Sequence, residues 1–201
     1  MTTDLHLVMH GAAIKKHGSA ADIAAVAGLD PQRVAGILAG AVASGRLLDV
    51  DGRYMLSPAG QMIVGAEYSR FCAALRDDTA FVDAYERFEV INRDLKQVIT
   101  RWQSMDLGGQ AVANDHSDSD YDDRIIGQLG DLHERFEPVL AALIGAVPRL
   151  AVYKRKLEEA LEKAEDGDIA WVSDARTESY HTVWFELHED LLRLLGRKRD
   201  E

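Results

Sequence analysis

The densest group of chemically versatile side chains lies near the C-terminus, between residues 178 and 190. Side chains three, four and seven positions apart share one face of a helix. His181, Trp184 and His188 have this spacing, and Tyr180 lies next to their face. The segment is therefore the first place to look for a bound ion or a small ligand.

Three interpretations of this cluster remain open. Histidines and carboxylates are zinc ligands, but His181 and His188 are two helical turns, about 10.5 Å, apart along the axis. One ion with bonds of about 2 Å does not easily span them, so we predict no metal and no cofactor. A pocket for a small-molecule effector, lined by Tyr180, His181, Trp184, His188 and His133, is the second interpretation. In the third, the aromatic side chains pack in a helical core or a dimer seam, which requires no ligand.

Recognised catalytic motifs are absent from the sequence. It contains no phosphate-binding loop, no Gly-x-Ser-x-Gly, no paired CxxC and no HExxH. The acidic segment 115–123 alternates carboxylates as calcium loops do, but it lacks the central glycine and the terminal glutamate of that motif. We therefore expect a solvated loop at 115–123 and a protein that is not an enzyme.

Charge is distributed unevenly along the chain. The 201 residues have a net charge of −11 and a hydrophobic content of 47%, without a long apolar run. Residues 1–76 contain seven Lys/Arg and six Asp/Glu, whereas the remainder contains 16 and 28. Only the first part approaches phosphate without strong repulsion. We expect a cytoplasmic protein that has no membrane partner.

The first part of the chain has the pattern of three helices, a hairpin and a further helix. Ser19 and Asp30 are favourable N-caps, and Pro31 follows at the first helical position. Asp51-Gly52 is a strong hairpin turn between two short apolar arms. The predicted elements are helices over 5–17, 20–27 and 31–44, a hairpin over 46–56, and a helix that begins at 58.

The second part is predicted to be helical apart from one loop. Apolar residues recur at three- and four-residue steps from Phe81 to Trp102, and this stripe is a candidate dimer or interdomain surface. Residues 106–123 lose the pattern and are predicted to form a mobile acidic loop. The fold class is mainly α with a small β-hairpin wing: a winged helix-turn-helix over 1–76, followed by an all-α dimerisation or effector domain over 77–201.

Three short segments carry a resemblance to a known group. Ala-Gly-Leu-Asp-Pro at 27–31, Gly-Arg-Leu-Leu at 45–48 and Gly-Arg-Tyr-Met-Leu-Ser-Pro-Ala-Gly at 52–60 resemble the bacterial winged-helix regulators grouped as MarR-like. This resemblance covers roughly a third of the chain. Residues 179–190 resemble tails of actinobacterial proteins of phosphoenolpyruvate and pyruvate metabolism, but no functional residue carries over from them.

The MarR-like resemblance implies contact with double-stranded DNA through the third helix and the wing. Glutamine reads adenine, and arginine reads guanine or binds phosphate. The expected DNA-binding residues are Gln32, Arg33, Gly36, Gly40 and Ser44 on the third helix, with Arg46, Arg53, Lys15 and Lys16 as phosphate contacts.

Two classes of function follow from these observations. In the first, the chain is a DNA-binding transcriptional regulator, dimeric, whose helical part dimerises and senses a small-molecule effector. In the second, it is an adaptor that does not bind DNA and that contacts a protein through its acidic helical part.

Overall fold

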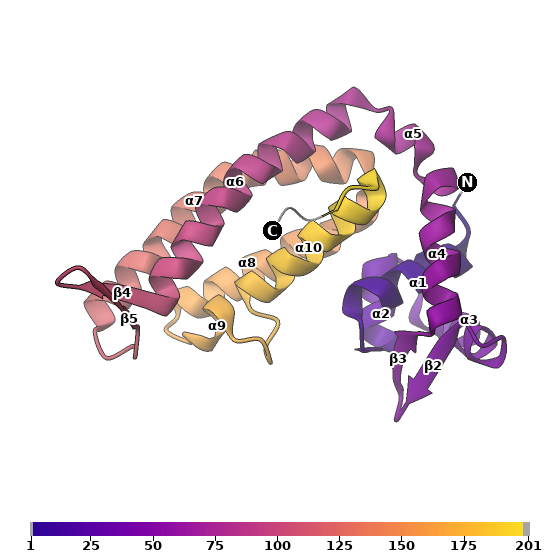
Figure 1. Cartoon of the computed structure of the whole chain (residues 1–201), viewed down its shortest axis with the longest axis horizontal. Coiled ribbons are helices and arrows are strands. Elements are labelled where there is room, and N and C mark those ends of the chain that lie inside the picture. Colours follow the sequence, from indigo (N-terminus) through magenta and orange to yellow (C-terminus); the bar gives the residue numbers. More distant parts are fainter. Residues whose placement is uncertain (1, 199–201) are drawn as a thin grey trace. The chain divides into compact units, whose positions relative to one another are not determined.

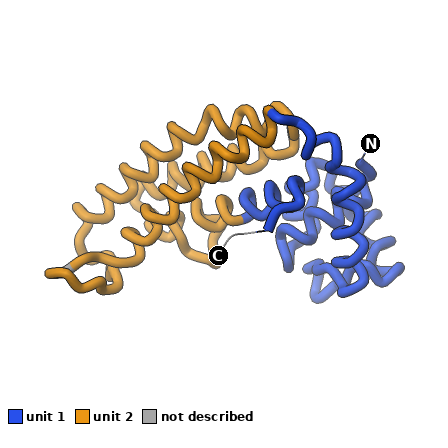
Figure 2. The backbone as a smooth tube through the Cα atoms, turned by 45° about the horizontal axis from the view of Figure 1, so that its top comes forward, with its two compact units in different colours: residues 1–79, 186–201 blue, residues 80–185 orange. Residues whose placement is uncertain are grey.

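The computed structural model describes residues 2–198, and the chain in it is mainly helical with a small antiparallel sheet (Figure 1). This confirms the predicted fold class. Contacts divide the chain into two compact units: residues 1–79 together with 186–201, and residues 80–185 (Figure 2). The predicted division placed one boundary after residue 76. In the structure, the last segment of the chain returns to the first unit.

The second and third helices of the first unit begin at the N-caps that the sequence indicates, whereas the first helix ends at Lys15, before the predicted end at residue 17, and Gly18 lies in a strand. The side chain of Ser19 accepts from the Asp22 N–H while Asp22 accepts from the Ser19 N–H, which is a capping box. Asp30 accepts from two backbone N–H groups at the start of the third helix. The helices are α1 (Asp4–Lys15), α2 (Ala20–Ala27), α3 (Pro31–Ala43), α4 (Pro58–Phe71) and the short α5 (Ala73–Arg76).

A three-stranded antiparallel sheet completes this unit. Its strands are β1 (Gly18–Ser19), β2 (Leu47–Val50) and β3 (Arg53–Leu56), in the order β1-β3-β2. Asp51 and Gly52, which join β2 to β3, both have positive φ, 53° and 77°. A two-residue hairpin loop with two positive φ values suits an Asp-Gly pair, as the sequence predicted.

The second unit contains long helices and a second, smaller sheet. Its elements are α6 (Thr79–Gln103), β4 (Ser104–Leu107), β5 (Gln110–Ala113), α7 (Ser119–Ala146), the 3₁₀ turn η1 (Pro148–Leu150), α8 (Ala151–Glu165) and α9 (Ala170–Ser173). The last helix, α10 (Tyr180–Leu195), begins in the second unit, and its residues from 186 onwards belong to the first.

The apolar stripe of α6 is covered within this single chain. Phe81, Phe88, Leu95 and Trp102 are each at most 3% exposed. Phe88 stacks on Trp184 at a ring-centroid distance of 5.1 Å, and both rings contact Phe136. The stripe therefore needs no second copy of the chain to shield it from water.

The segment predicted as a loop over 106–123 contains regular structure. Gly108 and Gly109, both with positive φ, join β4 to β5, and the Gly109 N–H donates to Asp106. Asp122, expected to be solvated, is buried and accepts from Asn114 at 2.8 Å. A Gly-Gly pair between two short arms is a hairpin signal, which the density of polar residues concealed. The mobility of this segment stays a prediction.

Within residues 2–198, no helix combines the length and the apolar character needed to cross a membrane.

Candidate functional site

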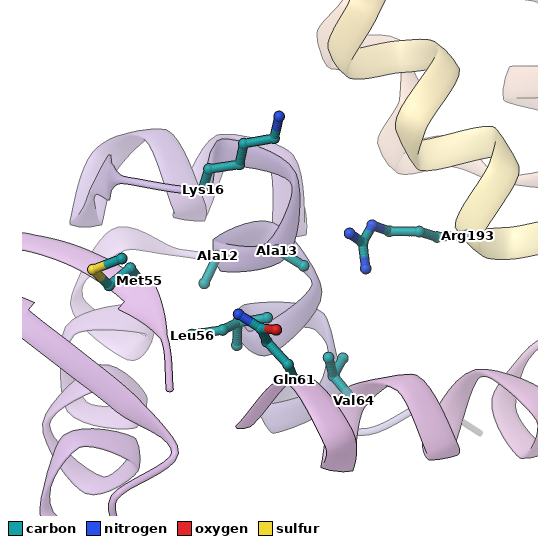
Figure 3. A pocket seen from close by; sticks show the side chains of 8 residues that line it. All are labelled: Ala12, Ala13, Lys16, Met55, Leu56, Gln61, Val64 and Arg193. Atoms are coloured by element: carbon teal, nitrogen blue, oxygen red, sulfur yellow. The ribbon is translucent and has the colours of Figure 1, made fainter. Parts of the chain in front are cut away.

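A cavity of about 480 Å³ lies in the first unit (Figure 3). Ligand pockets usually have volumes of roughly 300–1,000 Å³, so this cavity is large enough for a small molecule. It is lined by side chains from α1, β3, α4 and α10: Ala12, Ala13, Lys16, Met55, Leu56, Gln61, Val64 and Arg193.

Arg193 supplies a positive charge to this cavity. Its side chain is 32% exposed, and its Nε lies 2.8 Å from Oε1 of Glu189, one helical turn earlier. This contact orients the guanidinium, which extends from α10 toward α1 in Figure 3. An oriented guanidinium presents a planar fork of donors that matches the oxygens of carboxylate or phosphate.

Lys16 supplies a second cation, from an unusual backbone conformation. It follows the last residue of α1 and has φ 58°, a region that residues with a Cβ rarely adopt. Its N–H donates to the Ala12 carbonyl at 3.0 Å, which holds this conformation. Such strain persists only where the surroundings enforce it, and it is frequent at binding sites.

The remaining wall of the cavity is apolar, with one amide. Leu56 and Val64 are buried, whereas Met55 is 36% exposed. Gln61 lies on the first turns of α4 and offers both a donor and an acceptor. The cavity thus combines two cations, an amide and an apolar surface, which suits a ligand with an anionic end and a flat apolar end.

The expected DNA-binding residues of α3 do not form a basic surface. Arg33 forms an ion pair with Asp4. Gly36 is exposed and contributes no side chain, and Gln32 is exposed. Ser44 donates its hydroxyl hydrogen to the Ala41 carbonyl at 3.1 Å. The outward face of this helix therefore carries one arginine, which is already paired within the chain.

The expected phosphate contacts are divided among different partners. Arg53 donates to the His17 carbonyl at 2.7 Å. Lys15 pairs with Glu186 at 2.7 Å, whereas Lys16 lines the cavity. Arg46 is half-buried, and its carbonyl accepts from the Ser57 N–H.

The structure brings together three of the five residues expected to line an effector pocket. In the second unit, His133 Nδ1 lies 3.1 Å from the Tyr180 hydroxyl, and Tyr180 stacks on Trp184. Tyr180 is fully buried and Trp184 is 2% exposed, so both pack in the core. His181 is half-buried in the same unit, whereas His188 is buried and belongs to the first unit. The geometry favours the core interpretation of the two aromatic side chains.

Sequence reasoning missed most residues of the cavity. Met55, Gln61 and Val64 carry no motif, and Arg193 lies far along the chain from the other lining residues. The one available signal was the cationic pair Lys15-Lys16 at the end of a predicted helix.

Similarity to known proteins is limited. A protein of Frankia casuarinae named as a nucleotide-binding protein is 29% identical over 133 residues, which covers 62% of this chain and 82% of that protein. No family model matches the chain, and no solved structure matches it. Kinship with MarR-like regulators therefore stays a prediction.

The prediction of a DNA-binding transcriptional regulator is wrong. The finding that overturns it is the match to a protein named for binding nucleotides. The described contacts give a physical reason for the error. Arg33 and Arg53, on which the DNA hypothesis depended, both have partners within their own unit. Sequence alone shows that an arginine is present, but not which group it contacts.

Proposed function

We propose that the chain binds a nucleotide in the cavity of its first unit, without chemical turnover. Two observations support this proposal: the printed name of the Frankia relative and the chemistry of the cavity. The observation that carries it is the position of Arg193 and Lys16 beside an apolar wall, because a nucleotide has both phosphates and a flat base.

The lining of the cavity offers suitable side chains to both the phosphates and the base of a nucleotide. Charge-assisted hydrogen bonds from a guanidinium to phosphate are roughly twice as strong as neutral ones. Met55, Leu56 and Val64 offer the base apolar side chains to pack against. The Gln61 amide provides a donor and an acceptor for a base edge or a ribose hydroxyl.

This proposal replaces the predicted small-molecule effector with a nucleotide. It places the binding site in the cavity of the first unit and not in the aromatic cluster. A cytoplasmic location and a homodimer remain predictions, and neither is required for binding.

The test is calorimetric titration of the full chain with adenine and guanine mono-, di- and triphosphates. We expect Arg193→Ala to weaken nucleotide binding by about tenfold to a hundredfold, because a hydrogen bond to a charged group contributes about 1.5–3 kcal/mol. Arg176→Ala removes the same charge from a side chain that is 91% exposed in the second unit, and it should leave the affinity unchanged.

Replacement of Lys16 by glycine separates ligand binding from folding. Glycine adopts φ 58° without the steric cost of a Cβ, so thermal stability should not fall, whereas loss of the ammonium should reduce the affinity for phosphate. Adenosine and inorganic pyrophosphate test the two ends of the ligand separately. The proposal fails if no nucleotide binds the natural chain, or if Arg176→Ala weakens binding as much as Arg193→Ala.

A further inference from the structure

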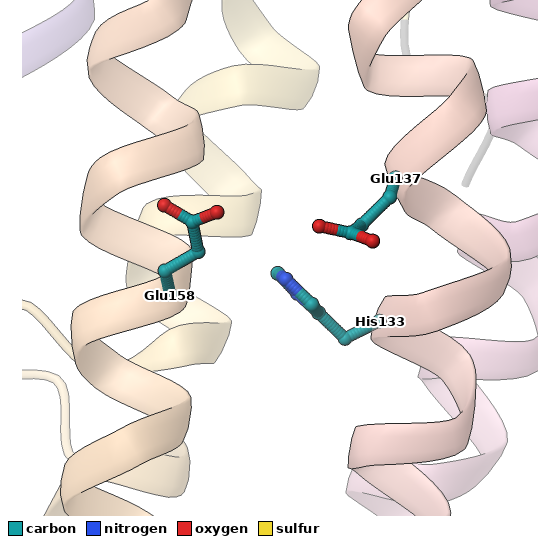
Figure 4. Close-up of side chains that lie close together, drawn as sticks. All are labelled: His133, Glu137 and Glu158. Carbon is teal, nitrogen blue, oxygen red and sulfur yellow. The ribbon is translucent and has the colours of Figure 1, made fainter.

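A cluster of three metal-ligand side chains lies in the second unit, apart from the cavity residues. His133 and Glu137 are one helical turn apart on α7, and Glu158 lies on the neighbouring helix α8 (Figure 4). One ligand atom from each residue lies within 4.8 Å of the other two. In Figure 4 the three side chains point into the space between the two helices.

The imidazole of His133 is buried and held by a second side chain. It is 7% exposed, and its Nδ1 lies 3.1 Å from the hydroxyl of Tyr180. In the tautomer whose Nδ1–H donates to the Tyr180 hydroxyl oxygen, Nε2 is the nitrogen left for an ion, and such an outer hydrogen bond is typical of metal-binding histidines.

We propose that His133, Glu137 and Glu158 bind one divalent transition-metal cation of the zinc type. One imidazole nitrogen with two carboxylates suits Zn²⁺, Mn²⁺ or Co²⁺ better than Mg²⁺ or Ca²⁺, which prefer oxygen ligands alone. The two carboxylates balance the charge of the ion. Three protein ligands leave at least one position for water, as in zinc sites that are open to a substrate.

The three side chains must move closer together to share one ion. Tetrahedral ligands at bonds of about 2.0–2.2 Å lie roughly 3.4 Å apart, whereas the three ligand atoms lie within 4.8 Å of one another. Glu137 and Glu158 are exposed, and their side chains rotate freely enough to close this difference. His133, which is buried, can stay in place.

Lys154 already provides a positive charge to the same two carboxylates. Its Nζ lies 3.9 Å from Glu137 and 3.5 Å from Glu158. Its side chain is 48% exposed, and pairs between exposed side chains contribute about 0–1 kcal/mol. A divalent ion therefore competes with a weakly held ammonium, and Lys154→Met should increase metal affinity.

The test uses the full chain without an added histidine tag, free of nucleotide. Calorimetry measures Zn²⁺ binding, and visible absorption follows Co²⁺. We expect one site per chain, with affinity reduced at least about a hundredfold in His133→Ala, since loss of an outer partner alone costs 10–100-fold. Glu158→Gln, at an exposed position that should not affect folding, should also weaken binding. The matched control is Glu159→Gln, because Glu159 pairs with Lys163 instead.

Three results would overturn this inference: Zn²⁺ affinity that is the same in Glu158→Gln as in the natural chain, equal losses in Glu159→Gln and Glu158→Gln, or Mg²⁺ that competes as well as Co²⁺. Either of the last two results would show that the cation binds non-specifically to exposed carboxylates. Circular dichroism of His133→Ala shows whether this variant is folded. If it is not folded, the affinity of Glu158→Gln for Zn²⁺ tests the proposed site. Because the metal site and the nucleotide cavity lie in different units, either proposal can fail without the other.

Discussion

Replacement of Gly60 by alanine is expected to destabilise the first unit by about 3 kcal/mol. A Cβ at this position of α4 would overlap the carbonyl oxygen of Arg46 and would lie 3.1 Å from Cε of Met9. The Arg46 carbonyl is fixed, because it accepts from the Ser57 N–H at the base of the wing. The helix must therefore shift away from the strand, and urea unfolding followed by circular dichroism should show the loss.

Gly65→Ala is the matched control for this substitution. Gly65 lies on the same helix, and a Cβ there would meet no atom within 4 Å. Alanine at an exposed helical position should stabilise the unit by up to about 1 kcal/mol. Equal and small effects of the two substitutions would show that α4 does not pack against Arg46 as described.

Trp184→Ala should cost about 3–5 kcal/mol of stability in the second unit, the range observed for large aromatic deletions from a core. The indole packs against Phe88 and Phe136, with ring centroids 5.1 and 4.5 Å away. Its Nε1 also donates to Asn92 Oδ1 at 3.0 Å. The substitution removes this packing and leaves a buried amide without its donor.

Two further variants separate these contributions. Trp184→Phe keeps much of the ring but loses the N–H, so its cost should be smaller and should reflect Asn92. Phe185→Ala removes a neighbouring aromatic side chain that is 39% exposed, and its effect should be well below that of Trp184→Ala. If unfolding measured by circular dichroism gives Trp184→Ala and Phe185→Ala the same cost, Trp184 does not lie in the core.

The parts of the fold that sequence predicted well depend on local chemistry. The capping box at Ser19 and Asp22, the N-cap at Asp30 and the turn at Asp51-Gly52 each satisfy backbone groups within a few residues. These caps and turns form without contacts from distant parts of the chain. The long amphipathic stripe of α6 was also predicted from sequence, although the residues that cover it lie within the same chain.

The candidate site was beyond sequence reasoning because it depends on distant contacts. Arg193 reaches the cavity only because the end of α10 belongs to the first unit. At Arg33 and Arg53 the sequence analysis made a different error, because it treated both side chains as available to bind DNA. In the structure, Arg33 pairs with Asp4 and Arg53 donates to the His17 carbonyl. The sequence analysis did not single out Glu137 or Glu158, and Glu158 approaches His133 and Glu137 only through the packing of α8.

The order of the two units along the chain has a consequence for synthesis. Residues 80–185 form one continuous unit, whereas the first unit is built from residues on both sides of that segment. Its buried His10 has Nε2 3.0 Å from Asp190, which lies on the last helix. On the ribosome, where domains generally fold from the N-terminus onward, residues 1–79 emerge before residues 80–185, and they must wait for the segment that contains Asp190 before His10 meets its carboxylate.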